Sequence, residues 1–299
     1  MRSGFGVARL ISGTPVYKSC KSLLPIPEAG FFVYISIHSH SFYLMNYLPP
    51  AFASLNQDYA RYTADDQWVW QTLFERQMQV LPTVASQRFL EGLPRVDFRA
   101  AKIPDFAEVN SLLAQVTGWT VVAVPGIVDD RTFFEQLAAR RFPATTWLRT
   151  PAQLDYLEEP DMFHDVFAHV PLLTDQYFAD FLQAVGTLAL RYLHDAHAVE
   201  LLSRLYWFTV EFGLIAESDR LRIYGAGILS SAGETKFCLS DEPARRPFDV
   251  ADILATPYVK DRMQDVYFII DSYEQLAASV PGLEAELLRL LAAQSVSVG

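Results

Sequence analysis

Apolar residues recur at the spacing of an α-helix along most of this 299-residue chain. In the first such run Val69, Leu73 and Met78 share one face, and residues 63–66 before them are typical of a capped helix start. Similar runs predict helices over 104–118, from about 130, and over 160–169, 174–193, 198–213, 248–255 and 272–293. Because amphipathic helices must bury their apolar faces against one another, the pattern predicts a mainly α-helical fold.

Short β elements are predicted between these helices, at 119–124, 221–224, 235–239 and 266–270. No repeat, low-complexity tract or Pro/Gly-rich linker divides residues 60–299, so we expect a single domain over 46–299. Residues 1–45 mix Gly, Ser, Lys and Arg without a helical period. We interpret them as an irregular N-terminal extension, which makes Met45 a candidate native start.

The composition narrows the class of protein. Hydrophobic residues make up 51% of the chain, which excludes a disordered protein. The formal net charge of −11 disfavours nucleic acid and anionic membranes as partners, and no apolar run reaches membrane-spanning length. The two cysteines form no CxxC pair and imply no disulfide framework. We therefore expect a cytoplasmic protein.

Two histidines five residues apart, His164 and His169, and a later glutamate, Glu211, form the candidate metal site. Two imidazoles and one carboxylate can occupy one face of an iron(II) ion and leave its other positions open. Residues five apart on an α-helix are offset by about 140°, so the rings converge only if the helix ends or distorts. Pro171 predicts such an end. Glu211 lies in an apolar run, where a carboxylate needs a cation or hydrogen bonds to stay ionised.

Other interpretations of these residues remain open. The histidines could be a hydrogen-bonded core pair, and Glu211 could lie half-exposed at a helix edge. His194 and His197 form a rival pair, which we interpret as a solvated junction between two helices. A His2Glu set also suits a zinc hydrolase, although zinc peptidases favour the HExxH spacing, which is absent here. A non-catalytic helical binding protein with a vestigial site is the last alternative.

Three longer strings in this chain resemble the aromatic amino acid hydroxylase family. They are EPDMFHDVFAHVPL at 159–172, YWFTVEFGL at 206–214 and YGAGILSS at 224–231. The resemblance covers roughly residues 55–275, keeps the family's order of motifs, and is strongest to the bacterial phenylalanine 4-hydroxylases. It implies the mostly helical catalytic-domain fold of that family, with small β elements.

The resemblance also implies a set of cofactors: Fe(II), a tetrahydropterin (tetrahydrobiopterin or a bacterial analogue), and O2 as cosubstrate. The iron would be held by His164, His169 and Glu211, which would be the catalytic centre. The implied pterin contacts are Val124, Gly126, Ile127, Val128, Phe133, Asp165 and Tyr206. Within this set Phe133 would stack on the pterin, Asp165 would reach it through water, and Tyr206 would stand near the iron. Without the resemblance, Gly126 is a turn residue and Phe133 a core aromatic.

The implied substrate is L-phenylalanine, which would be hydroxylated to L-tyrosine in the first step of phenylalanine catabolism. The implied substrate contacts are Arg149, Pro160, Trp207 and Ser230. A guanidinium fork suits a carboxylate, whereas Pro160 and Trp207 would wall the ring. Taken alone, Arg149 would be a surface charge and Ser230 a turn serine. Another aromatic amino acid is the alternative substrate, although Trp207 matches phenylalanine and tyrosine hydroxylases better than tryptophan hydroxylases.

The chain departs from the family pattern at two positions. Ala168 replaces a glycine that usually precedes the second histidine; a position with positive φ would be strained by alanine, whereas ordinary helical geometry would accept it. Pro143 stands where animal members carry a histidine, as expected of a bacterial type. No long coiled-coil tail is present, so we expect a monomer or dimer and not a tetramer.

Overall fold

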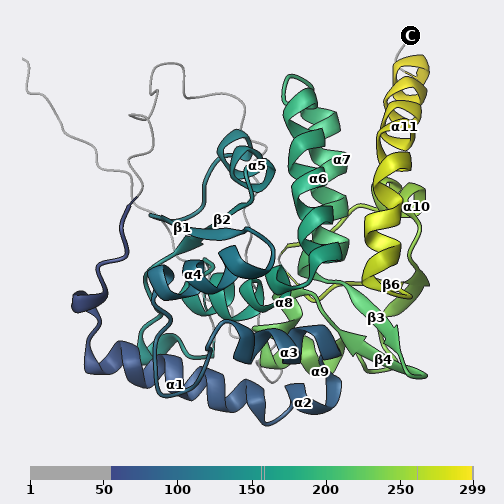
Figure 1. The fold of residues 1–299 in the computed structure, drawn as a ribbon. Helices are drawn as coiled ribbons and strands as arrows, with labels where there is room; N and C mark the ends of the chain where they lie inside the picture. The colour runs from purple at the N-terminus through teal and green to yellow at the C-terminus, as the bar shows by residue number, and fades with distance from the viewer. Residues whose placement is uncertain (1–54, 156, 158, 261, 298–299) are drawn as a thin grey trace, which may run out of the picture.

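The computed structural model describes residues 55–155, 157, 159–260 and 262–297 of the chain (Figure 1). The extension predicted over 1–45, the candidate start at Met45 and the first residues of the predicted domain lie outside this part. Within the described ranges, no helix combines the length and the apolar character that crossing a bilayer requires.

Helices dominate the fold, which confirms the predicted class. The α-helices are α1 (Ala64–Met78), α2 (Leu81–Val84), α3 (Gln87–Arg95), α4 (Phe106–Val116), α5 (Asp130–Ala138), α6 (Gln176–Tyr192), α7 (Ala196–Tyr206), α8 (Ala226–Leu229), α9 (Ala232–Phe237), α10 (Val250–Ala255) and α11 (Tyr273–Ser297). Two π-helices, Phe163–Ala168 and Trp207–Glu211, and three short 3-10 helices, Tyr59–Arg61, Pro151–Gln153 and Val170–Thr174, complete the helical set of the described residues.

The strands of the described residues form two small sheets. Strands β1 (Thr120–Val124) and β2 (Arg141–Thr145) pair in parallel, joined through α5. The second sheet has the order β4-β3-β6-β5, built from β3 (Leu214–Glu217), β4 (Arg220–Ile223), β5 (Ala244–Pro247) and β6 (Val266–Ile270). Helix α6 packs against α5, α7 and α11, and in Figure 1 the three long helices α6, α7 and α11 stand side by side.

Side-chain caps fix where the helices begin. The Thr63 hydroxyl accepts a hydrogen bond from the Asp66 N–H, and the Asp66 carboxylate accepts one from the Thr63 N–H at 2.8 Å, as the sequence predicted. At the start of α4, α5, α6, α7 and α10 an aspartate side chain accepts backbone N–H groups of the first turn. These aspartates are Asp105, Asp129, Asp175, Asp195 and Asp249. Since a cap fixes the first residue of a helix, it also fixes which residues of α5 and α7 face inward.

The predicted strand at 235–239 is wrong, because this segment lies mostly in α9. The Ser231 hydroxyl accepts the N–H of Glu234 at 3.2 Å and starts the helix there. The Thr235 hydroxyl then donates to the carbonyls of Ile228 and Ser231. These local bonds give the carbonyls partners within the segment, whereas in a strand they would need a neighbouring strand. The predictions for β1, β4 and β6 are confirmed, whereas α3, β2, β3 and β5 were not predicted.

Candidate metal centre and active-site pocket

Two π-helices supply the three candidate metal ligands. His164 lies in Phe163–Ala168, His169 is the residue that ends it, and Glu211 is the last residue of Trp207–Glu211. In the second π-helix the N–H of Phe212 donates to the carbonyl of Trp207, five residues earlier, at 2.8 Å. A turn closed over five residues holds one residue more than an α-helical turn, so residues five apart come nearer to a common face. This distortion is how the two histidines converge.

The core side of the first π-helix holds it in place. The rings of Phe163 and Phe167 stack with centroids 4.5 Å apart, and Trp70 of α1 and Phe89 of α3 pack edge-on against them at 5.5 Å and 5.8 Å. Ala168 is fully buried as the last residue of this π-helix and does not have positive φ. The strain considered for Ala168 is therefore absent.

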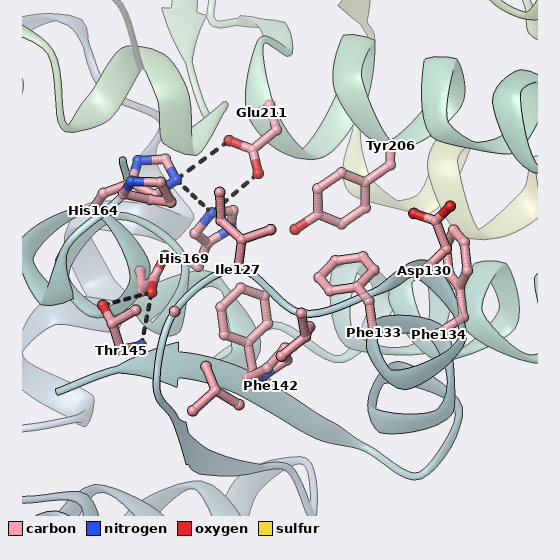
Figure 2. A pocket seen from close by; sticks show the side chains of 16 residues that line it. Ile127, Asp130, Phe133, Phe134, Phe142, Thr145, His164, His169, Tyr206 and Glu211 are labelled. Atoms are coloured by element: carbon pink, nitrogen blue, oxygen red, sulfur yellow. Dashed lines mark hydrogen bonds and ion pairs between the residues drawn. The ribbon is translucent and has the colours of Figure 1, made fainter. Parts of the chain in front are cut away.

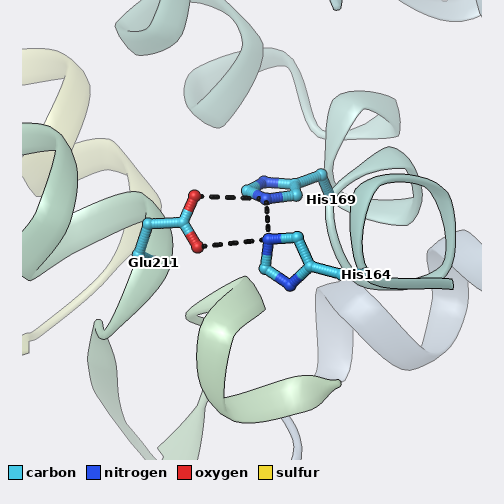
Figure 3. Close-up of side chains that lie close together, drawn as sticks. All are labelled: His164, His169 and Glu211. Carbon is cyan, nitrogen blue, oxygen red and sulfur yellow. Dashed lines mark hydrogen bonds and ion pairs between the residues drawn. The ribbon is translucent and has the colours of Figure 1, made fainter. Parts of the chain in front are cut away.

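The candidate ligand atoms meet in a buried cluster (Figure 3). His164 Nε2 and His169 Nε2 lie 3.3 Å apart, Glu211 Oε1 lies 3.2 Å from His169 Nε2, and Glu211 Oε2 lies 3.7 Å from His164 Nε2. The exposed fractions of the three residues are 2%, 4% and 1%. Their ligand atoms all lie within 4.8 Å of one another, as a single ion requires.

The charges and hydrogen bonds of the cluster fit a divalent cation. Glu211 Oε2 is buried and has no hydrogen-bond partner. Burial favours the neutral acid, but the His169 and His164 imidazoles outweigh it and hold the pKa of Glu211 below its ordinary value. Burial lowers the pKa of His164 to about 4, against the opposing charge of Glu211, so its ring is neutral at pH 7. A neutral imidazole beside an unpartnered carboxylate oxygen is a donor set that a metal ion completes.

Ser230 fixes which nitrogen of His164 faces the metal position. The Ser230 hydroxyl donates to the carbonyl of Ala226 at 2.9 Å, and its oxygen lies 2.9 Å from His164 Nδ1. Because a hydroxyl has one proton to donate, the Ser230 oxygen accepts from Nδ1–H, and Nε2 keeps its lone pair. Gly225, just before α8, lets this segment pack closely on the backbone of Glu211, since a Cβ there would lie 2.4 Å from the carbonyl oxygen of Glu211.

A pocket opens beside the cluster, and Figure 2 shows its lining. The lining comprises Val124, Gly126, Ile127, Val128, Asp130, Phe133, Phe134, Phe142, Pro143, Thr145, Pro160, His164, Asp165, His169, Tyr206 and Glu211. All seven residues predicted to contact a pterin are among them. The segment that follows β1 and the first turns of α5 form one wall, whereas α7 and the first π-helix form the other.

The pocket combines aromatic faces with Asp165, a partly buried acid from the first π-helix. The Phe133 ring packs edge-on against Tyr206 at 5.2 Å, and Phe142 lies against the His169 ring at 4.7 Å. Asp165 accepts hydrogen bonds from the Thr145 N–H at 2.8 Å and the Thr145 hydroxyl at 2.9 Å. Burial raises the pKa of Asp165 to about 6, despite these bonds. Such a site suits a flat, nitrogen-rich heterocycle that stacks and accepts or donates hydrogen bonds.

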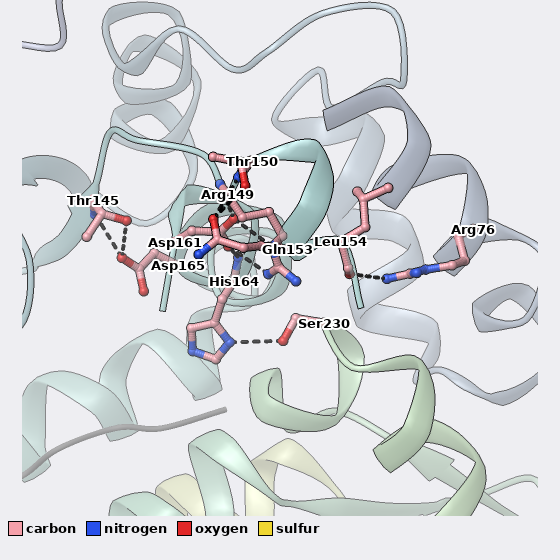
Figure 4. A network of polar contacts seen from close by, with 10 residues as sticks. All are labelled: Arg76, Thr145, Arg149, Thr150, Gln153, Leu154, Asp161, His164, Asp165 and Ser230. Atoms are coloured by element: carbon pink, nitrogen blue, oxygen red, sulfur yellow. Dashed lines mark hydrogen bonds and ion pairs between the residues drawn. The ribbon is translucent and has the colours of Figure 1, made fainter. Parts of the chain in front are cut away.

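The residues predicted to contact the amino acid are less uniformly placed. Pro160 lines the pocket, whereas Arg149, Trp207 and Ser230 do not. Arg149 is buried and forms a two-pronged ion pair with Asp161, with Nε–Oδ2 and Nη2–Oδ1 distances of 2.8 Å and 2.9 Å. The Asp161 carboxylate also accepts the N–H of His164 at 3.2 Å, so Arg149 and Ser230 both reach the metal cluster through His164 (Figure 4). The alternative interpretation of Arg149 as a surface charge is wrong, because its exposed fraction is 7%.

Sequence reasoning missed the partners of the predicted residues. Thr145 and Phe142 come from β2, and Asp161 lies three residues before His164. Since β2 pairs in parallel with β1, the ends of both strands lie at one edge, where Val124 is found. Recognition of 141–145 as the parallel partner of the first predicted strand would have placed Thr145 beside Val124 at the site.

His194 and His197, the rival pair, do not form a candidate metal site among the described residues. Asp195 between His194 and His197 caps α7 by accepting the N–H groups of His197 and Ala198 at 2.9 Å and 3.2 Å. This confirms the junction between two helices that the sequence predicted. Among the described residues, the His164, His169 and Glu211 group is the one set of three such side chains close enough to share an ion.

Comparison with known proteins places this site in a described family. The model of the biopterin-dependent aromatic amino acid hydroxylases matches residues 56–293. A phenylalanine-4-hydroxylase from Chromobacterium violaceum is 49% identical over 248 residues, which cover 82% of this chain and 83% of that protein.

Solved structures of the Chromobacterium violaceum phenylalanine hydroxylase share the fold. One that holds iron(III) and oxidised 7,8-dihydrobiopterin is similar with a TM-score of 0.76 at 49% identity, over 80% of this chain and 86% of that one. Another, which holds iron and phenylalanine, has a TM-score of 0.75 at 48% identity, over 80% and 87% of the two chains.

Proposed function

Since this chain belongs to the family of biopterin-dependent aromatic amino acid hydroxylases, we propose that it is a phenylalanine 4-monooxygenase. It converts L-phenylalanine to L-tyrosine with O2, Fe(II) and a tetrahydropterin, as the first step of phenylalanine catabolism. One observation carries the proposal: a buried His2Glu cluster, with an unpartnered carboxylate oxygen, opens onto an aromatic pocket. The zinc-hydrolase and vestigial-site alternatives are set aside, because the family's chemistry is hydroxylation.

The residues of this chain would prepare the site for that reaction. When bound, ferrous iron and the reduced pterin supply the electrons for oxygen activation. His164, His169 and Glu211 would hold one face of the ion and leave the pocket side open. Ser230 keeps the lone pair of His164 Nε2 directed at the ion. The apolar walls would exclude water from the reacting centre.

Two groups of residues would position the organic reactants. Phe133 and the loop that follows β1 support a pterin ring, with Asp165 at its edge to hold a proton or a water. Arg149, already oriented by Asp161, would offer its remaining N–H groups to the substrate carboxylate. Pro160 and Trp207 would then bound the aromatic ring. Holding the aromatic ring of the substrate close to the oxidant and in the right orientation is the main contribution that such a site makes to the rate.

The decisive test is product analysis with one ligand removed. The wild-type chain, loaded with Fe(II) without oxygen and then given O2, a tetrahydropterin and L-phenylalanine, is expected to form tyrosine. Glu211→Ala should bind no iron and lose turnover by more than about 100-fold, since outer-shell partners alone cost 10–100-fold. Glu91→Ala is the control, because Glu91 makes surface contacts: ion pairs at 3.6 Å and 3.9 Å and a hydrogen bond from the Gln87 side chain at 3.1 Å.

The outcomes of this test separate the candidate functions. Normal iron content and turnover in Glu211→Ala would contradict the ligand assignment. Hydroxylation of tyrosine or tryptophan in preference to phenylalanine would favour the alternative, a hydroxylase of another aromatic amino acid. Product analysis by mass spectrometry with each amino acid distinguishes these cases directly.

The organisation of the enzyme is part of the proposal. Residues 46–299 form a single catalytic domain and residues 1–45 an extension of it. The enzyme works in the cytoplasm as a monomer or dimer. The net charge of −11 and the absence of a disulfide pattern in the sequence support this setting.

A further inference from the structure

The indole of Trp207 is held from outside its own helix. Its Nε1–H donates to the side-chain oxygen of Gln264 at 2.9 Å, and the exposed fractions of Trp207 and Gln264 are 1% and 3%. The Tyr258 ring stacks on the indole at 4.5 Å with an interplanar angle of 22°. The Phe212 ring lies against the indole at 4.7 Å with a tilt of 35°. The buried hydrogen bond and the stacked Tyr258 ring both come from residues that follow α10.

Gln264 joins these two restraints. Its side-chain N–H donates to the carbonyl of Val259 at 2.9 Å, so the same amide holds the segment that carries Tyr258. The amide oxygen restrains the indole edge, and the amide nitrogen restrains the residue next to the stacked ring. Loss of this one side chain would release both.

A buried acid anchors Gln264 to the other side of the site. The Glu234 carboxylate accepts the backbone N–H of Gln264 at 3.5 Å and the hydroxyl of Tyr267. Glu234 lies in α9, which follows α8 and Ser230 directly. The network therefore links the segment that carries Ser230, which contacts His164, to the indole of Trp207.

We propose that Gln264 is a positioning residue that sets the choice among aromatic amino acids, by fixing the indole of Trp207. The proposal rests on the proposed function, in which Trp207 bounds the substrate ring. Without Gln264 the buried indole N–H would lack an acceptor, and the ring would shift to find one. A wall displaced by the size of a methylene group changes discrimination between side chains by about 10–200-fold.

The first experiment removes the acceptor at nearly constant volume. Gln264→Leu is expected to raise the KM for phenylalanine and to lower the ratio of kcat/KM for phenylalanine over tryptophan by about tenfold. The KM for the tetrahydropterin and the iron content should not change, because Gln264 itself neither lines the pocket nor bonds to any of the three candidate ligands. Gln264→Met provides a second variant without an acceptor, should the leucine variant fail to fold.

A matched control separates this role from general stability. Gln183 also accepts one side-chain N–H, from Arg140 at 2.8 Å, and donates to one backbone carbonyl, that of Ala138 at 3.1 Å. It lies in α6 and does not line the pocket. Gln183→Leu removes the same kinds of bond and is expected to leave the phenylalanine-to-tryptophan ratio unchanged.

A double-mutant cycle tests whether Gln264 acts through the indole. Trp207→Phe removes the N–H, so Gln264→Leu should cause no further change of the ratio in that background. A full tenfold change there, or an unchanged ratio in both Gln264 variants, would overturn the proposal. A wild-type chain that hydroxylates no phenylalanine would instead overturn the proposed function, which keeps the two failures distinguishable.

Discussion

At the scale of single residues, Ser230 shows how much of a metal site lies beyond its ligands. Its hydroxyl is committed twice, as donor to Ala226 and as acceptor from His164. The ring of His164 is thereby held in one tautomer before any ion arrives. This fixed tautomer lowers the free-energy cost of binding a metal, because the His164 ring need not reorient or change its protonation.

We expect Ser230→Ala to weaken iron binding by about 10–100-fold. The variant removes the acceptor for Nδ1–H but leaves all three ligands in place. Anaerobic Fe(II) titration measures the effect independently of turnover. Ser240→Ala is a suitable control, since that hydroxyl also donates to a backbone carbonyl, of Phe237 at 2.8 Å, far along the chain from the ligands. Equal iron affinities of parent and Ser230→Ala would show that the tautomer is set elsewhere.

Much of the candidate site was predictable residue by residue, and the remainder had a common cause. The ligands lie in long strings that can be recognised in order, and the pterin contacts were implied by the same family resemblance. Asp161 and Thr145 were missed because their roles exist only through contacts with Arg149 and Asp165 that no local pattern announces. Trp207 was identified from the sequence as a candidate substrate contact. Its hydrogen bond to Gln264 could not be predicted, because it joins residues that are distant in the sequence.

At the scale of elements, the π-helix of residues 163–168 resolves the awkward spacing of the histidines. The sequence predicted an α-helix that ends or distorts at His169, and the structure shows a wider turn throughout. Ala168 fits this turn because it needs no positive φ. Its methyl group is fully buried and fills space that the family's usual glycine would leave.

We therefore expect Ala168→Gly to lower the free energy of unfolding by about 1–2 kcal/mol, from helix propensity and the lost buried methyl group. Urea unfolding of the iron-free protein measures the change. Ala107→Gly serves as the comparison, because Ala107 is exposed in α4 and contributes propensity alone. A glycine variant as stable as the parent would mean that the turn is not helical at this position.

The strands that were not predicted illustrate a different limit. Strand β2 contains Pro143, and β5 contains Arg245 and Arg246, so neither has the composition of a strand. Each exists because a neighbour offers its backbone: β1 pairs with β2, and β6 pairs with β5. Helices, whose hydrogen bonds are local, were therefore predicted better than strands.

At the scale of the whole molecule, the described residues bring distant segments to one pocket. The segment after β1 with α5 supplies one wall and α7 with the first π-helix supplies the other, and a single cluster of buried apolar residues runs beneath them. The mainly helical class followed from periodicity, whereas this convergence did not, because it depends on how α5, α6 and α7 pack.

A chain that begins at Met45 is expected to keep full turnover and to sediment as a monomer or dimer. The reason is that every residue assigned to the metal, pterin and substrate lies between Val124 and Ser230. Analytical ultracentrifugation and the tyrosine-formation assay, with the full-length chain as control, check both points. A tetramer, or a loss of turnover of more than about tenfold, equal to 1.4 kcal/mol, would contradict the proposed organisation.

The two π-helices also constrain how the sequence of such a chain can change during evolution. Each holds one residue more per turn than an α-helix, so deletion of one residue would let the segment relax to 3.6 residues per turn. A deletion between the two histidines would leave them four residues apart on that α-helix, where they again share one face. A deletion without that change of turn, or a change of turn without a deletion, would separate them. Ala168 shows that a side chain here can be exchanged. The number of residues between the histidines and the kind of turn that joins them must therefore change together in evolution.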